Sequence, residues 1–129
     1  MPHYLDTSAF IKLVRTEPES PALLADLGGG PDLVSSALLV VEGRRAAARY
    51  GTVAEARARA ALSTITLLPI DNTILEHAAS LPPPVLRSLD ALHLATATSL
   101  GDDSGHFYCY DVRLGSAAAM LGLDVRQPA

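Results

Sequence analysis

Short apolar stretches that resemble β-strands alternate with helical stretches along the whole sequence, and this alternation is the strongest constraint on the fold. Strands are expected at His3–Asp6, Leu33–Val34, Thr64–Leu68 and Phe107–Tyr110, and Leu123–Val125 is a candidate for a further edge strand. The strands are separated by segments long enough for helical crossovers, which favours parallel pairing. The sequence therefore predicts an α/β fold, a three-layer α/β/α sandwich around a central parallel sheet of four or five strands.

Capping and helix-breaking residues define where the helices between these strands should begin and end. Ser20 and Pro21 are typical of a helix start, with serine at the N-cap and proline at the first helical position. The glycines at 28–30 should end that helix, and Thr52–Glu55 matches a capping box. Helices are expected at Thr7–Val14, 20–27, from Ser35 or Ser36 to Gly51, from Thr52, from Asp71 to Ala79, at Ser88–Leu100 and at Val112–Leu121.

The length and composition bound the class of protein. A chain of 129 residues, of which 49% are hydrophobic, can bury a core as a single domain over residues 1–129. With Cys109 as its one cysteine, the chain can form no internal disulfide, which favours a reducing compartment. The sequence has no apolar run of transmembrane length, and its start lacks the features of a signal peptide. We therefore expect a cytoplasmic protein with no membrane association.

The net charge of −4 is unfavourable for a protein that binds nucleic acid, because phosphates attract basic surfaces. The chain has 14 acidic and 10 basic residues, so four acids facing bound cations would leave the remainder balanced. Five arginines also gather in one stretch, at positions 44, 45, 49, 57 and 59. This stretch is either a phosphate-binding surface or a solvated helical face, and the sequence leaves both readings open.

Two aspartates directly follow or end apolar strands, and their positions predict a shared location. Asp6 ends the first strand and Asp111 follows the fourth. Side chains at the carboxyl ends of parallel strands meet at one edge of the sheet, where sites form in α/β proteins. Both residues could instead serve simply as helix N-caps, and that alternative stays open.

Two further acids belong to helices. Asp90 lies in the first turn of a helix, where an acid also complements the helix dipole. Glu42 is expected about two turns into its helix, and it could pair with Arg45 or Arg49 on the same face. The four apolar residues that precede Glu42 make a plain solvated face a poor explanation for it.

Four clustered carboxylates would have a narrow chemistry. Like charges packed together repel one another, and protonation or a cation must relieve the repulsion. Hard oxygen ligands select Mg²⁺ or Mn²⁺, which can activate water and neutralise a phosphodiester under attack. The candidate catalytic and metal-binding residues are therefore Asp6, Glu42, Asp90 and Asp111.

The stretches that contain these acids resemble those of PIN-domain ribonucleases, in particular the VapC toxins of bacterial type II (VapBC) toxin–antitoxin systems. The matching segments occur in the family's order and spacing over nearly the whole chain, at 4–9, at 35–38 leading to Glu42, at 86–97 and at 110–114. The resemblance implies a PIN-like fold and a Mg²⁺- or Mn²⁺-dependent endoribonuclease that acts as a toxin. It implies that Asp6 and Asp90 bind metal directly and that Glu42 and Asp111 complete the pocket, often through water.

The resemblance also suggests roles around the pocket. Ser8 occupies a small hydroxyl position that could hold a phosphate or a bound water. Cys109 stands where these proteins more often carry threonine, which weakens the expected support of Asp111 but leaves the ligand set unchanged, because a thiol is a weak hydrogen-bond partner. Arg87 and Arg113 could contact RNA phosphates, a partner protein or the nearby carboxylates.

Family membership further implies partners. VapC toxins are usually homodimers and bind a VapB-type antitoxin, whose C-terminal segment covers the active site, often with an arginine at the carboxylates. The complex commonly binds operator DNA through the antitoxin. RNA is the implied substrate.

Two alternatives to this interpretation remain open at the level of sequence. The chain could be a PIN-like enzyme that is not a toxin, such as a DNA nuclease or a phosphatase, or a catalytically silent module that binds nucleic acid or a partner. His93, one turn after Asp90, could form a metal pair with it, but we expect a packing or hydrogen-bonding residue beneath the pocket. Cys109 is expected to be a small buried residue without a nucleophilic role.

Overall fold

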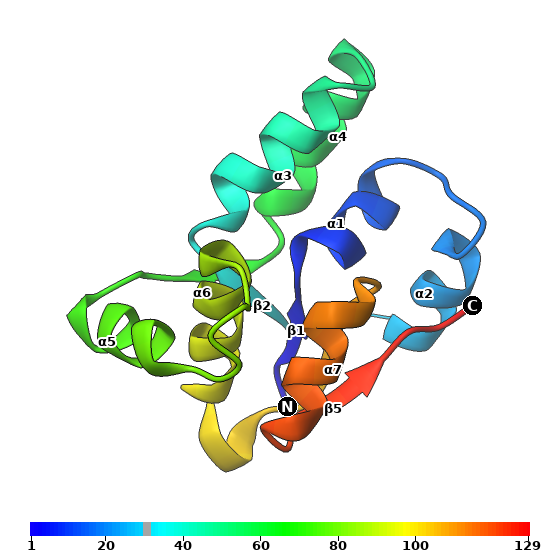
Figure 1. The fold of residues 1–129 in the computed structure, drawn as a ribbon. Helices are drawn as coiled ribbons and strands as arrows, with labels where there is room; N and C mark the ends of the chain where they lie inside the picture. The colour runs from blue at the N-terminus through cyan, green and yellow to red at the C-terminus, as the bar shows by residue number, and fades with distance from the viewer. Residues whose placement is uncertain (30–31) are drawn as a thin grey trace.

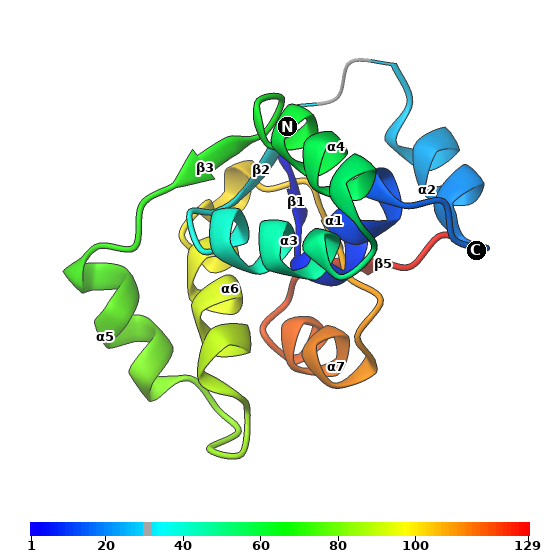
Figure 2. The same ribbon diagram turned by 90° about the horizontal axis from the view of Figure 1, so that it is seen from above.

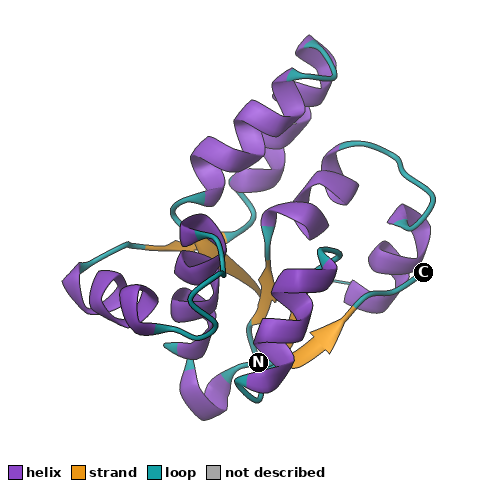
Figure 3. Cartoon of the chain, in the orientation of Figure 1, coloured by secondary structure: helices purple, strands orange, loops and turns teal. Residues whose placement is uncertain are grey.

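A computed structural model describes residues 1–29 and 32–129 and contains a central sheet covered by helices on both faces (Figures 1 and 3). The strands are β1 (His3–Leu5), β2 (Leu33–Ser36), β3 (Thr66–Leu68), β4 (His106–Tyr108) and β5 (Asp124–Arg126). The helices are α1 (Thr7–Val14), α2 (Ser20–Leu27), α3 (Leu39–Ala48), α4 (Thr52–Leu62), α5 (Asn72–Ser80), α6 (Ser88–Thr98) and α7 (Val112–Met120). A 3₁₀ turn, η1 (Gly101–Asp103), lies between α6 and β4.

All strands of the sheet run parallel, in the order β3-β2-β1-β4-β5. The central strand β1 pairs with β2 through Tyr4 and Val34 and with β4 through Tyr4 and Phe107. The edge strand β5 pairs with β4, one residue later in the chain than expected. The predicted three-layer α/β/α sandwich around a parallel sheet is therefore confirmed, with the larger of the two strand numbers.

The alternation of side chains along each strand divides the core between the two faces of the sheet. Leu5, Leu33 and Tyr108 pack with α1 to α4 on one face. Their neighbours Tyr4, Val34 and Phe107 pack with α6 and α7 on the other. In the view from above, α7 lies below β1, whereas α4 lies beside the upper part of that strand (Figure 2). Because helices cover both faces, the inner strands β1 and β4 bury apolar or aromatic side chains on both sides of the sheet.

The helices α3 and α4 form a hairpin that extends away from the sheet (Figure 1). Gly51 closes the hairpin with φ of 103°, a conformation that favours glycine, and α4 begins at the next residue. The predicted capping box does not form, because α4 has no side-chain cap bond. Glu55 instead pairs with Arg44 of α3 and with Arg59 one turn along α4. The arginines of this stretch thus partly neutralise an acid on the hairpin itself.

The expected start of α3 is wrong by several residues. Ser35 and Ser36 belong to β2, and the helix begins only at Leu39. Ser35 donates its hydroxyl to the carbonyl of Leu5 at 2.6 Å, and the backbone N–H of Ser36 donates to the Tyr4 hydroxyl at 3.2 Å. These buried bonds keep both serines in the sheet, so that Glu42 lies in the first turn of α3 and not two turns into it.

Smaller corrections concern helix ends. Ser20 is the first residue of α2 and makes no cap bond; its hydroxyl donates to the carbonyl of Lys12 and accepts from the backbone N–H of Glu17. Asp71, the first residue of an expected helix, is the N-cap of α5 and accepts from the Ile74 N–H. Gly30, the last glycine of the expected helix stop, lies outside the described residues. Within the described part of the chain, no helix is long and apolar enough to cross a membrane.

Candidate active site

Each of the acids singled out by the sequence lies at the N-terminus of a helix, on the edge of the sheet where the parallel strands end. Asp6 and Asp111 are the N-caps of α1 and α7, and Glu42 and Asp90 lie in the first turns of α3 and α6. The N-terminus of a helix carries a partial positive charge that stabilises carboxylates. The fold can therefore bring several negative charges to one edge before any ligand binds.

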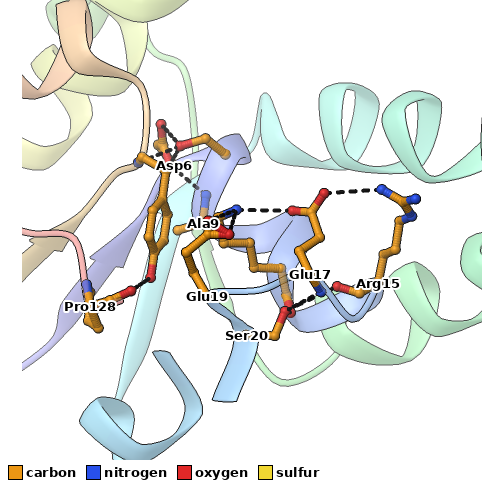
Figure 4. Close-up of polar contacts among 10 residues, drawn as sticks. Asp6, Ala9, Arg15, Glu17, Glu19, Ser20 and Pro128 are labelled. Carbon is orange, nitrogen blue, oxygen red and sulfur yellow. Dashed lines mark hydrogen bonds and ion pairs between the residues drawn. The ribbon is translucent and has the colours of Figure 1, made fainter. Parts of the chain in front are cut away.

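Asp6 is the most buried of these acids, with only 3% of its surface exposed. Its carboxylate accepts hydrogen bonds from the Ala9 N–H at 2.9 Å and from the Ser8 hydroxyl at 2.7 and 2.8 Å (Figure 4). The Ser8 oxygen in turn accepts from the backbone N–H of Tyr110 at 2.8 Å. Burial raises the pKa of Asp6, although these hydrogen bonds act in the opposite direction. Ser8 thus holds Asp6 in place and links it to the segment after β4.

Glu42 is held by side chains from two other helices. Its Oε1 accepts from the Thr7 hydroxyl of α1 and from Nε2 of His93 in α6, both at 2.7 Å. Burial by itself would raise the pKa of Glu42, but the bonds from His93 and Thr7 outweigh it and lower that pKa. Glu42 is therefore ionised at neutral pH and fixed at one oxygen.

Asp90 and Asp111 are bridged by a single arginine. Arg87 donates from Nε to Oδ2 of Asp90 at 3.0 Å and from a terminal nitrogen to Oδ2 of Asp111 at 3.2 Å. The other oxygen of Asp111 accepts from the Leu114 N–H at 3.0 Å, which is the N-cap bond of α7. Of the three kinds of partner expected for Arg87, the one seen in the structure is the nearby carboxylates. The Arg87 side chain is 68% exposed and approaches the acids from the solvent side.

Cys109 supports Asp111 differently from the way the sequence suggested. Its thiol is fully buried and donates to the backbone carbonyl of Asp111 at 3.3 Å, not to the carboxylate. Burial, followed by the charge of Asp6, raises the pKa of the Cys109 thiol. The residue is thus a small buried side chain, as expected, and the orientation of the Asp111 carboxylate comes from Leu114 and Arg87.

The charges of the region favour a bound cation, although the acids are not arranged as a finished metal centre. Among the described residues, no three His, Cys, Asp or Glu side chains stand together as a ready-made metal group. Their carboxylates have protein partners instead: Arg87 bridges Asp90 and Asp111, and Glu42 is bonded to Thr7 and His93. Oxygen atoms that already hold a guanidinium have the charge and chemistry to hold a divalent cation in its place. The residues present fit such an ion.

A groove of about 580 Å³ opens beside these acids, between the segment before α6 and the outer face of α7. Arg87, Asp90 and Arg113 contribute its charged side chains. Much of the remainder is apolar and strongly exposed, at Val85, Val112 and Met120. Arg113 therefore lies in the groove beside the acids and not among them.

The sequence patterns did not indicate the roles of Thr7 and Tyr4. Thr7 follows Asp6 directly and reaches Glu42, while the buried Tyr4 hydroxyl bonds to Nδ1 of His93 at 2.7 Å. His93 has the hydrogen-bonding role beneath the pocket that the sequence favoured over a metal pair with Asp90. A polar residue one turn after Asp90 was the available signal, but its partners depend on the tertiary fold.

Comparison with known proteins places the chain in a family. A family model described as the PIN domain matches residues 3–107, a range that includes Asp6, Glu42 and Asp90 and ends before Asp111. Ribonuclease VapC46 of Mycobacterium tuberculosis is 45% identical over 98% of this chain and 97% of its own length. This chain belongs to the VapC ribonucleases of the PIN-domain family. Ribonuclease VapC47 of the same organism is 38% identical to this VapC-family chain, over 97% of the chain and 96% of that relative.

Solved structures share the fold of this VapC-family chain at low sequence identity. A toxin–antitoxin complex from Klebsiella pneumoniae aligns over 98% of both chains with a TM-score of 0.73 and 24% identity. VapC20 of M. tuberculosis, described as a toxin that cleaves the sarcin–ricin loop, aligns over 89% of this chain and 94% of its own, with a TM-score of 0.70 and 16% identity. VapBC2 from Rickettsia felis, bound to a DNA fragment from its promoter, aligns over all of both chains with a TM-score of 0.70 and 11% identity.

Proposed function

We propose that this VapC-family chain is the toxin of a type II toxin–antitoxin system and hydrolyses RNA phosphodiester bonds with a bound Mg²⁺ or Mn²⁺. The observation that carries the proposal is the gathering of carboxylates from separate helix N-termini at one edge of the sheet. The similarity of this chain to relatives named VapC ribonucleases supports RNA as the substrate, in preference to DNA or a phosphate monoester.

The proposed roles follow from the surroundings of each acid. Asp6 and Asp90 would hold the metal directly: Asp6 is buried without an ion pair among the described residues, and Asp90 is countered only by an exposed arginine side chain. Asp111 and Glu42 would complete the coordination or orient the attacking water, the roles that the resemblance to PIN-domain ribonucleases implies for them. When bound, the cation would lower the pKa of water and neutralise charge on the phosphate.

The remaining residues of the site would act on the substrate or its surroundings. Ser8 would keep Asp6 oriented and is close enough to the acids to contact a phosphate or a bound water. Arg87 has to leave Asp90 and Asp111 when a cation binds there, and its guanidinium is then free for an RNA phosphate. Arg113, in the groove beside the acids, is the second candidate for a phosphate contact.

The same groove supports the proposed partner, a VapB-type antitoxin. Its exposed apolar side chains suit an apolar segment of a second protein, and the acids at its end suit an arginine carried by that segment. Two of the structural neighbours are toxin–antitoxin assemblies, one of them on promoter DNA. From the family resemblance we further propose a homodimeric toxin that meets operator DNA only through the antitoxin.

Cleavage assays on three substrates test the function. The purified chain should cut structured RNA in Mg²⁺ or Mn²⁺, stop in excess chelator, and leave single-stranded DNA and a phosphate monoester intact. Asp6→Asn and Asp90→Asn should abolish cleavage in folded protein, whereas Asp102→Asn, an exposed acid in η1, should leave it unchanged. Full activity of either site variant would refute the mechanism. A folded wild-type chain that cuts none of the substrates would favour the silent binding module.

A further inference from the structure

A buried hydrogen-bonded chain leads from the core of the sheet to one oxygen of Glu42. The Tyr4 hydroxyl bonds to Nδ1 of His93 at 2.7 Å, and Nε2 of His93 bonds to Oε1 of Glu42 at 2.7 Å. Tyr4 and His93 are each only 2% exposed. These hydrogen bonds therefore connect β1, α6 and α3 through the buried side chains of Tyr4 and His93.

The direction of each hydrogen bond follows from the groups that take part. The ionised Glu42 can only accept, so Nε2 of His93 must carry a proton and donate it. The Tyr4 oxygen already accepts from the backbone N–H of Ser36 at 3.2 Å, and its own proton is available for Nδ1. An imidazole ring with a proton on Nε2 and an acceptor at Nδ1 satisfies every group in this buried network.

This arrangement fixes the carboxylate of Glu42 on one side. Oε1 accepts from both His93 and Thr7, whereas the hydrogen bonds among the described residues include none to Oε2. We propose that His93, held by Tyr4, is a positioning residue that orients Glu42 so that Oε2 serves the catalytic site. The proposal deepens the function proposed above and rests on it for its catalytic consequence.

Metal binding by His93 itself is incompatible with the same geometry. Both ring nitrogens are already engaged, Nδ1 by Tyr4 and Nε2 by Glu42, and the ring is buried beneath the acids. Asp90 lies one turn before His93 on α6. One helix therefore presents a carboxylate to the site and, from its buried face, fixes a second carboxylate on another helix.

Kinetics of two substitutions at the same position separate positioning from packing. His93→Leu fills the space but removes the donor, and we expect kcat to fall about 10- to 100-fold, the usual effect of losing such a supporting bond. KM for RNA should stay unchanged, because His93 does not reach the substrate. His93→Gln places an amide N–H close to the position of Nε2 and should restore most of kcat. His77→Gln on the exposed face of α5 is the matched control and should behave as wild type.

A second measurement on metal-free protein needs no activity. Long-range ¹H–¹⁵N NMR of the imidazole should find a proton on Nε2 in the wild type, with Nδ1 as an acceptor. A ring without a proton on Nε2 would overturn the proposal, as would an unchanged kcat in folded His93→Leu. Lack of metal-dependent cleavage by the wild type would instead refute the proposed function, and the NMR result would still decide whether His93 donates to Glu42.

Discussion

Replacing Asp6 by asparagine should stabilise the metal-free fold while removing its activity. Asp6 is 3% exposed, and the described residues give it no ion pair to offset its burial. Asparagine has nearly the same shape, is an equally good N-cap for Ala9 N–H, and can exchange a hydrogen bond with Ser8. The substitution therefore removes the buried charge and keeps the local structure.

The size of the effect follows from competing contributions. Taking an isolated carboxylate out of water costs several kcal/mol, and hydrogen bonds to a charged group each return about 1.5–3 kcal/mol. The raised pKa of Asp6 shows that burial outweighs the bonds, so the ionised form opposes folding. We expect a net gain of about 1–2 kcal/mol in the free energy of unfolding at pH 7, a typical return from relieving a functional site. For a domain of this size the gain raises Tm by roughly 3–10 °C.

The pH dependence has a definite sign. An acid whose pKa is higher in the folded state than in the unfolded chain makes the fold less stable as pH rises through the interval between those pKa values. The wild-type chain should therefore lose stability from Asp6 as pH rises through this acidic range, and the Asp6→Asn variant should lack this contribution. Thermal unfolding in chelator from pH 4 to pH 8 measures both.

Metal titration and a matched cap variant complete the test. At a concentration 100 times Kd, Mn²⁺ should stabilise the wild type by about 2.7 kcal/mol and the variant far less. Asp71 is also an N-cap, accepting from Ile74 N–H at 2.9 Å, but it is exposed, so Asp71→Asn should change stability little. An Asp6→Asn protein less stable than wild type in chelator at pH 7 would refute the reasoning.

Three further predictions concern other parts of the molecule. In Gly43→Ala, the new Cβ would lie 2.7 Å from a ring carbon of the fully buried Phe10. We therefore expect the free energy of unfolding, measured in urea, to fall by about 1–3 kcal/mol, and a more stable variant would contradict this close packing. Arg87→Gln should leave stability nearly unchanged, because the side chain is exposed, and should raise Mn²⁺ affinity in calorimetry by removing a competing cation; weaker binding would argue against that competition. Burial and then the charge of His106 lower the pKa of His3 in the folded protein. Its contribution to stability is therefore complete above about pH 6.5 and is lost as pH falls from there through the lower, folded-state pKa. If the Tm of His3→Gln falls with pH as steeply as that of the wild type, His3 is not the source of this dependence.

The sheet and the edge on which the acids lie were predictable because they depend on periodicity and on strand ends. Asp6 and Asp111 directly follow apolar strands, and parallel pairing then brings them to one edge whatever the details of packing. Helix boundaries depended on more distant contacts. Ser35 and Ser36 have good N-cap chemistry, but their bonds to Leu5 and Tyr4 keep them in β2.

The contacts inside the site were beyond sequence patterns for a similar reason. The sequence left three kinds of partner possible for Arg87: RNA phosphates, a partner protein and the nearby carboxylates. Its spacing from Asp90 and Asp111 in the sequence could not show that it binds these two aspartates. The bond from His93 to Glu42 joins residues 51 positions apart, and the one from Tyr4 to His93 spans 89. Periodicity carries no information on such pairs, since they are fixed only when both faces of the sheet have closed.

The gathering of acids from four helix N-termini has a consequence during synthesis of the protein. Asp6 emerges from the ribosome among the first residues, but Asp111 joins it only after β4 has paired with β1 and α7 has formed. A partly made chain therefore holds these carboxylates apart. The edge proposed as the active site is complete only when the last crossover of the sheet, from β4 through α7 to β5, has folded.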